Sequence, residues 1–268
     1  MDEKKKVVIA VTAFFVLVAV VIALYFLVLR KKPDEPVETP EITQDIPVEG
    51  ETVEEDIQIP EPLQVNLDQS DDVVRIRGAE LSSHTTLSQW LKSNDLIRSF
   101  VAAVDNIANG ETPRPHIAFF KPDGNFDIVV RDGLVLIDPG SYKRYNLVAD
   151  VFSSLNAKQT VRLYWLLSPT LQEAYKELGY PDRAFQKTLI TAIGELLKVP
   201  ILDQSIEVEK DVVSYKIVDP RLESLNPAQK HLLRMGPENV EIIQAKLREL
   251  AKELGVPDSE LPQKFYPD

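Results

Sequence analysis

The clearest helical signal in the chain is FQKTLITAIGELL, which occupies residues 185–197. Its mainly apolar positions recur every three or four residues, so in a helix they form one continuous stripe. The stripe consists of Phe185, Thr188, Leu189, Ala192, Ile193, Leu196 and Leu197. We expect this helix to begin near Asp182 and to end before Pro200, because proline cannot continue a helix. A stripe of this length must pack against other elements, so it indicates a core built from helices.

A second stripe lies on the expected helix 95–109, and Gly110 supplies its stop signal. This stripe consists of Leu96, Ile97, Phe100, Val101, Val104, Ile107 and Ala108. Further helices are predicted at 70–77, at 85–92, around 148–155, from Asn156, from Ser168 to Gly179, and after Asp219-Pro220, Asn226-Pro227 and Gly236-Pro237. Helices therefore dominate the chain after residue 68.

Two stretches have the composition of β-strands. Residues 116–120, 126–131 and 134–137 predict a three-stranded meander, in which Asp132-Gly133 is a two-residue hairpin turn. Residues 206–208 and 212–218 predict a second hairpin. The strands do not alternate regularly with helices, which argues against a doubly wound sheet. The sequence thus predicts a mainly α, α+β domain over residues 68–256, followed by a loose tail at 257–268.

Several polar residues stand directly before predicted helices. Ser70, Asp138, Asp182 and Asp219 each suit the N-cap position, where a side-chain oxygen accepts a hydrogen bond from a free backbone N–H. The three aspartates could also act as acid or base groups. Capping is the better interpretation, because each lies beside a proline at a predicted helix start.

The acidic charge of the chain is concentrated in one segment. The formal net charge is -12, yet residues 33–74 contain 14 Asp and Glu residues and no Lys or Arg. Six prolines fall within residues 33–67, a composition that cannot bury a core and predicts a disordered, extended linker. We interpret the linker as a spacer, with an interaction tail for a basic partner as the alternative. Residues 75–268 show no basic excess, so no nucleic-acid partner is expected.

An uncharged, apolar run precedes this linker. It extends for 23 residues from Val7 to Leu29 and is followed by Arg30-Lys31-Lys32. As a helix it would span roughly 34 Å, enough to cross a hydrocarbon core of about 30 Å. The run exceeds the apolar part of a cleaved signal peptide, so it predicts an uncleaved single-pass anchor. Basic residues flank it almost equally, and the free amino terminus favours a cytoplasmic N-terminus with the domain on the extracytoplasmic side.

Sequence signatures of catalysis are missing from the chain. It has no cysteine, no Gly-rich phosphate-binding loop, no His-Glu-x-x-His and no Gly-x-Ser-x-Gly. Its three histidines, His84, His116 and His231, are far apart in sequence, so we expect neither a metal site nor a cofactor. Tyrosines and Trp165 at helical spacing could line a sugar-binding cleft, although core packing is their more ordinary role.

Two groups of polar residues are candidate binding sites. Arg98, Asp105 and Asn106 lie on the expected helix 95–109, where Arg98 and Asp105 are two turns apart on roughly one face. Arg234, Glu238 and Asn239 lie at the junction of the last two helices, where a helix N-terminus beside an arginine could hold an anion. The alternative at the junction is purely structural, with capping and an Arg–carboxylate pair fixing the corner.

The chain resembles a bacterial, membrane-anchored family of uncharacterised proteins, the domain-of-unknown-function family 3014. The resemblance extends over residues 68–252 and is strongest at the junction between the last two helices. The residues that carry it are Asp95 to Val101, Val104 to Asn106, Asp138-Pro139 with Tyr142 and Tyr145, Gln172 to Tyr175, Leu178 to Asp182, Gln229-Lys230 and Leu232 to Asn239. It implies no known activity, cofactor or catalytic residue.

Two functions follow as hypotheses. The first is a non-catalytic module at the bacterial inner membrane, with its domain in the periplasm or otherwise extracytoplasmic, that binds another envelope protein. The second is an enzyme or ligand-binding module for cell-envelope material that uses Arg98, Asp105, Arg234 or Glu238. A cytoplasm-facing assembly factor is a third possibility. The sequence carries no signal for an oligomeric state.

Overall fold

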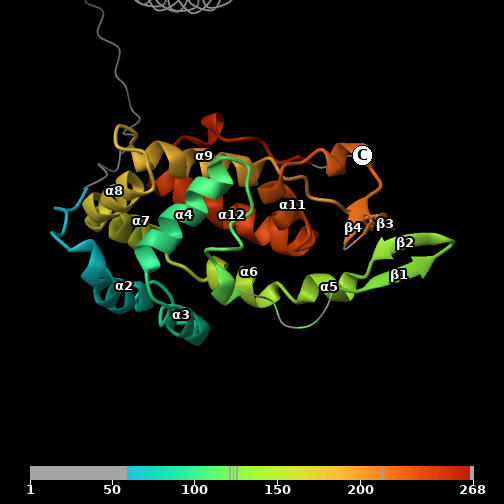
Figure 1. Cartoon of the computed structure of the whole chain (residues 1–268), viewed down its shortest axis with the longest axis horizontal. Helices are drawn as coiled ribbons and strands as arrows, with labels where there is room; N and C mark the ends of the chain where they lie inside the picture. The colour runs from blue at the N-terminus through green and yellow to red at the C-terminus, as the bar shows by residue number, and fades with distance from the viewer. Residues whose placement is uncertain (1–58, 121, 123, 125, 213, 266–268) are drawn as a thin grey trace, which may run out of the picture. The chain divides into compact units, whose positions relative to one another are not determined.

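The computed structural model in Figure 1 describes residues 59–120, 122, 124, 126–212 and 214–265. The predicted membrane anchor at 7–29 and residues 33–58 of the predicted linker lie outside this range. Among the described residues, no helix has both the length and the apolar character needed to cross a membrane.

The described chain is mainly helical with two small antiparallel sheets, which confirms the predicted class. The helices are α2 (Ser70–Ala79), α3 (Thr85–Trp90), α4 (Leu96–Ala108), α5 (Pro139–Lys143), α6 (Asn146–Ser153), α7 (Ala157–Leu166), α8 (Ser168–Glu177), α9 (Phe185–Leu197), α10 (Pro220–Glu223), α11 (Pro227–Leu233) and α12 (Pro237–Glu253). The strands are β1 (Ile128–Arg131), β2 (Leu134–Ile137), β3 (Val208–Lys210) and β4 (Tyr215–Ile217). Three short 3-10 turns are η1 (Leu67–Gln69), η2 (Ala118–Phe120) and η3 (Asp258–Glu260).

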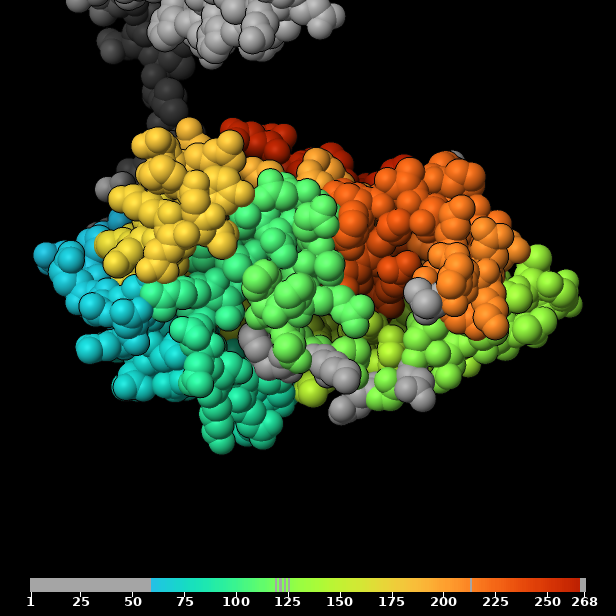
Figure 2. Space-filling view, in the orientation of Figure 1, coloured from blue at the N-terminus to red at the C-terminus, as the bar shows by residue number. Residues whose placement is uncertain are grey.

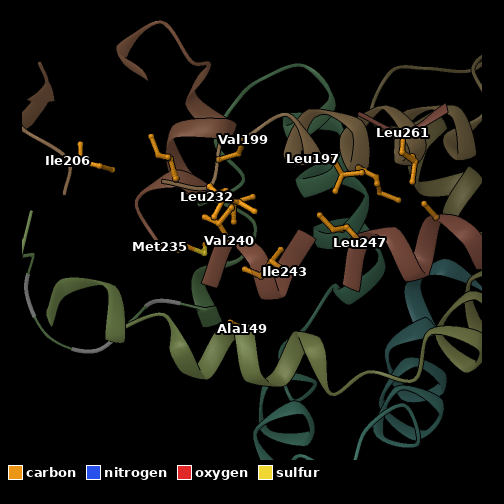
Figure 3. Packing of buried hydrophobic residues seen from close by; sticks show 14 of the residues in the cluster. Ala149, Leu197, Val199, Ile206, Leu232, Met235, Val240, Ile243, Leu247 and Leu261 are labelled. Carbon is orange, nitrogen blue, oxygen red and sulfur yellow. The ribbon is translucent and has the colours of Figure 1, made fainter. Parts of the chain in front are cut away.

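Helix α9, the stretch that dominates the sequence pattern, joins two hydrophobic clusters. Phe185 and Ala192 are buried in a smaller cluster that α4 and α8 complete. Ile193 and Leu197 are buried in a larger cluster around α12, and Leu189 packs against both. In Figure 3, residues of α12 lie between Ala149 of α6 and residues from α9 and α11. The stripe therefore serves two cores.

The two sheets lie next to each other at one end of the domain (Figure 1). β1 and β2 pair in the register Val129↔Leu136 and Arg131↔Leu134. Their turn residues, Asp132 and Gly133, have φ of 52° and 82°. Two positive φ angles are typical of the type I′ turn, so the predicted hairpin is confirmed. A single bridge, Leu136↔Glu207, connects β2 to the segment that begins β3.

The predicted strand at 116–120 is wrong. Residues 114–116 form a turn in which the backbone N–H of His116 donates to the carbonyl of Pro113 (2.9 Å), and η2 follows. Pro113 and Pro115 lack the N–H groups that a strand needs to pair, so this stretch closes on itself. β1 and β2 therefore form a two-stranded hairpin rather than a meander.

Two predicted caps are also corrected. The hydroxyl of Ser70 donates to the carbonyl of Leu67 (2.7 Å), because α2 continues directly from η1. Asp182 does not cap α9, whose N-cap position is Ala184. Instead Gln172 of α8 accepts a hydrogen bond from the backbone N–H of Phe185 (2.9 Å). Asp138 and Asp219 cap α5 and α10 as predicted.

Both ends of the predicted domain extend further than expected. The backbone N–H of Leu63 donates to the carbonyl of Leu166 (2.8 Å), and Leu67 is buried, so the last residues of the predicted linker pack on the domain. At the other end, η3 follows Pro257, and Leu261 is buried in the larger cluster. The N–H of Ile201 donates to the carbonyl of Phe265 (3.1 Å). Burial of Leu67 and Leu261 explains both differences.

Candidate functional site

Arg98 binds three carboxylates on the surface of the smaller cluster. Its guanidinium donates to Glu177 of α8 through Nε (2.8 Å) and Nη2 (3.2 Å), and to Asp68 of η1 (2.6 Å). Asp95 lies 3.6 Å away. The hydrogen bonds from Glu177 and Asp68 raise the pKa of Arg98, and Arg98 in turn lowers the pKa of Glu177. Arg98 therefore ties η1, α4 and α8 together.

Asp105 and Asn106 also hold segments in place. Asp105 is buried, and its carboxylate accepts a hydrogen bond from the Tyr180 hydroxyl (3.3 Å). The Tyr180 ring stacks on Tyr175 with 4.7 Å between the ring centroids. The amide of Asn106 donates to the carbonyl of Thr112 (3.1 Å), which fixes the loop after α4. These residues stabilise the ends of α8 and α4.

The junction between α11 and α12 is organised by Asn239. Its buried amide donates to the carbonyls of Met235 (2.8 Å) and Tyr142 (3.1 Å) and to the side-chain oxygen of Asn146 (3.1 Å). The Tyr142 ring lies against Gly236 at the N-terminus of α12. The expected Arg234–Glu238 pair does not form among the described residues, and Asn239 fixes this corner instead.

In the described part of the chain, the side chains of Arg234 and Glu238 make no hydrogen bond and no ion pair. Nor does any such bond in this part of the chain join them to Arg98 or Asp105. Arg98 instead contacts Glu177 and Asp68, and Asp105 contacts Tyr180. Arg234 and Glu238 lie at the junction of α11 and α12. The described residues also contain no group of three His, Asp or Glu side chains that could hold a metal ion.

His231 of α11 is partly buried and lies near the positive charges of Arg114 and Arg234. Burial, together with the nearby charges of Arg114 and Arg234, lowers its pKa from 6.5 to about 4. Since the unfolded chain takes up a proton on this residue at a higher pH than the folded chain, stability is lost as the pH falls from 6.5 towards 4. Above pH 6.5 the residue is neutral in both states.

His231→Gln is therefore expected to reduce the acid sensitivity of the protein. Between pH 7 and pH 4, the unfolding free energy of the variant should fall by up to about 3 kcal/mol less than that of the wild type. Urea unfolding of the detergent-solubilised chain, followed through Trp90 and Trp165, measures this difference. Parallel curves above pH 7 are the internal control, and curves that stay parallel down to pH 4 would contradict the prediction.

An open groove lies between α2 and α7, where the N-terminal segment meets the domain. Its volume is about 510 Å³, and its apolar lining is Leu63, Leu81, Leu163 and Leu166. Its polar lining is Arg77, Glu80, Gln159 and Arg162. Arg77 pairs with Glu80 at 3.7 Å, whereas Arg162 is exposed and forms no ion pair within the described ranges. We call this feature the α2–α7 groove.

Sequence reasoning missed the α2–α7 groove. Its leucines come from three segments, and two of those segments carry apolar residues that look like ordinary core positions. The only local signal was Arg162, a cation on α7 with no acid at the i±3 or i±4 positions of the same helix. The groove exists because Leu63 is held against the end of α7 by the hydrogen bond to Leu166.

The fold and its polar contacts describe a helix-rich domain with a surface groove and structural ion pairs. The chain belongs to the family described as Protein of unknown function (DUF3014), whose profile matches residues 96–251. The match runs from the start of α4 to near the end of α12 and so includes α7 but not α2. No curated protein and no solved structure matches the chain.

Proposed function

We propose that the chain is a non-catalytic interaction module at the inner membrane of a bacterial cell, anchored by residues 7–29, and that its domain binds another envelope protein in the α2–α7 groove. The observation that carries the proposal is the groove itself, with its apolar floor and charged rim. Its volume of about 510 Å³ falls within the range of sites that hold small ligands and short segments.

The chemistry of the lining favours binding over catalysis. Arginine stays protonated in proteins, so Arg77 and Arg162 do not exchange protons at neutral pH. Glu80 is the one carboxylate of the lining, and it pairs with Arg77. Four leucines and an arginine without a partner suit a segment that has apolar side chains followed by an acidic residue. A partner segment of this kind is our proposed ligand.

The position of the domain is also part of the proposal. The uncharged run Val7–Leu29 and the acidic, proline-rich linker motivate a tether that holds the domain away from the membrane on the extracytoplasmic side. Protease treatment of spheroplasts should digest the domain. Protection of the domain in intact spheroplasts, with digestion after lysis, would instead place it in the cytoplasm.

Photo-crosslinking in the native cell tests the groove. A benzophenone amino acid at Gln159, which lines the groove, is expected to capture one envelope protein. The same amino acid at Gln89, exposed on α3, is the matched control and should not. Arg162→Glu should reduce the adduct at position 159, because it reverses the charge of the rim.

Two outcomes would contradict the proposed function. One is equal crosslinking at positions 159 and 89. The other is an adduct at 159 with residues 33–58 of the same chain, identified by mass spectrometry, since the acidic segment would then occupy the groove.

A further inference from the structure

The outer edge of β1 has the properties of an unpaired strand. Among the described residues, β1 pairs only with β2, and β2 is connected on its other side to the segment that begins β3. Figure 1 shows the hairpin projecting beyond the helices, with β2 on the side of β3 and β4, and Figure 2 shows its tip protruding at the same end. Val130 of β1 is 63% exposed.

Alternation of the hydrogen bonds identifies which backbone groups point outwards. In an antiparallel pair, opposite residues alternate between bonded and non-bonded pairs, and a two-residue turn is closed by a bonded pair, here Arg131↔Leu134. Two observed hydrogen bonds agree with this alternation. The Asp138 N–H donates to the Asp127 carbonyl (3.1 Å), and the Ile137 N–H points away from β1 and donates to the Ile206 carbonyl (3.0 Å). The N–H and C=O groups of Ile128 and Val130 therefore face away from β2.

β1 has no lysine, proline or bulge at this edge. Exposed edge strands usually carry lysine, proline or a bulge, because unpaired N–H and C=O groups can template another strand. The sequence of β1 is Ile-Val-Val-Arg, and within the described ranges the backbone of Ile128 and Val130 makes no hydrogen bond on the outer side.

The charges at the two ends of the strand indicate which kind of strand could pair with the outer edge of β1. Asp127 and Arg131 flank the three apolar residues 128–130. Both charged side chains are exposed and make no ion pair within the described part of the chain. If two copies of this strand pair antiparallel about Val129, Asp127 of each copy lies opposite Arg131 of the other. Ile128 then lies opposite Val130, so the four outward-facing residues form bonded pairs. The positions of the charges and the alternation of the backbone hydrogen bonds both favour this register.

We infer that a second copy of the chain binds at the β1 edge, so that one sheet continues through both copies around a two-fold axis at Val129. The inference goes beyond the proposed function, because pairing of β1 does not require a ligand in the α2–α7 groove. Failure of one proposal would not imply failure of the other, because position 159 in the groove and position 129 on β1 belong to different surfaces.

A disulfide test is direct because the chain has no cysteine. Val129 would form a non-bonded pair with its own copy, with about 4.5 Å between the Cα atoms, which a disulfide can bridge. Full-length Val129→Cys, in detergent under mild oxidation, is expected to form a covalent dimer. Val212→Cys is the matched control, because Val212 is 92% exposed but lies outside β1. Equal dimer yields for the two variants would overturn the inference.

Charge exchange tests the register and excludes association through the anchors alone. Arg131→Asp or Asp127→Arg should weaken the dimer about ten-fold, because each replaces two attractive pairs by two repulsive ones. The double variant, with both charges exchanged, should restore the affinity of the wild type. Light scattering of the full chain over a range of concentrations measures all four proteins. Failure of the double variant to recover affinity would overturn the proposed register.

Discussion

Gly236→Ala is expected to destabilise the domain by about 4 kcal/mol or more, which would leave little folded protein. Gly236 has φ 86° and ψ 159°, a backbone conformation that essentially only glycine adopts. An added Cβ would also lie 2.3 Å from Cγ of Tyr142 and 2.7 Å from its Cβ. Tyr142 has little room to move, because its carbonyl accepts a hydrogen bond from Asn239 and its ring packs on the larger cluster.

The control for this variant is Gly179→Ala. Gly179 has φ 107°, but nothing lies within 4 Å of the position that a Cβ would take. It should therefore lose only the backbone contribution, about 1–2 kcal/mol. In a double-mutant cycle, Tyr142→Ala should offset part of the Gly236→Ala effect. Urea unfolding measures all of these differences, and equal losses for the two glycine variants would contradict the steric argument.

Gln244→Leu is expected to lower the unfolding free energy by about 3 kcal/mol. The buried amide of Gln244 donates to the carbonyls of Leu196 (3.0 Å) and Val199 (2.8 Å), with Leu197 at 3.4 Å. A side chain of α12 thus supplies hydrogen-bond donors to the backbone carbonyls at the C-terminus of α9. Leucine has a similar size but no donor, so the Val199 carbonyl would stay buried without its partner, while the Leu196 carbonyl would keep only its backbone donors from Lys198 and Val199.

Two comparisons separate the lost hydrogen bonds from a general effect of substitution. Gln89→Leu changes an exposed glutamine on α3 and should alter stability by less than about 0.5 kcal/mol. Gln244→Glu should be more harmful than Gln244→Leu at neutral pH, because a carboxylate would face carbonyl oxygens. Acidification should recover part of its stability, since a protonated carboxyl can donate again. A Gln244→Leu variant as stable as Gln89→Leu would contradict this role.

The elements of the fold were largely predictable where local chemistry decides them. The stripes of α4 and α9, the Asp132-Gly133 turn and the caps Asp138 and Asp219 all depend on neighbours in sequence. The N-terminus of α9 was different, because Gln172 from another helix takes the place of a local cap. The C-terminus of α9 depends in the same way on Gln244, which the sequence did not single out. Long-range caps of this kind have no local signature.

The candidate site was less predictable than the fold. Residue type and spacing selected Arg98, Asp105 and Asn239 as polar residues of consequence, but not their partners Glu177, Tyr180 and Asn146, which are brought close by tertiary packing. The α2–α7 groove depends on where Leu63 lies, and that residue belongs to a stretch whose composition predicted a linker. Hydrophobic periodicity predicts which face of a helix is buried, but it does not predict a groove that forms where three segments meet.

The contacts at the start of the domain have a mechanical consequence. Any force that reaches the domain along the chain from residues before Ile59 is felt first where this segment attaches. The Leu63–Leu166 bond, the bond from Thr170 to the Val65 carbonyl (3.1 Å) and the Arg98–Asp68 pair follow one another there. Tension would reach the Leu63–Leu166 and Thr170–Val65 bonds before Leu67 of the smaller cluster, and the Arg98–Asp68 pair only after Leu67. The first two bonds would therefore resist a pull on the chain before Leu67 leaves its cluster, and Arg98 would hold the segment that follows Leu67.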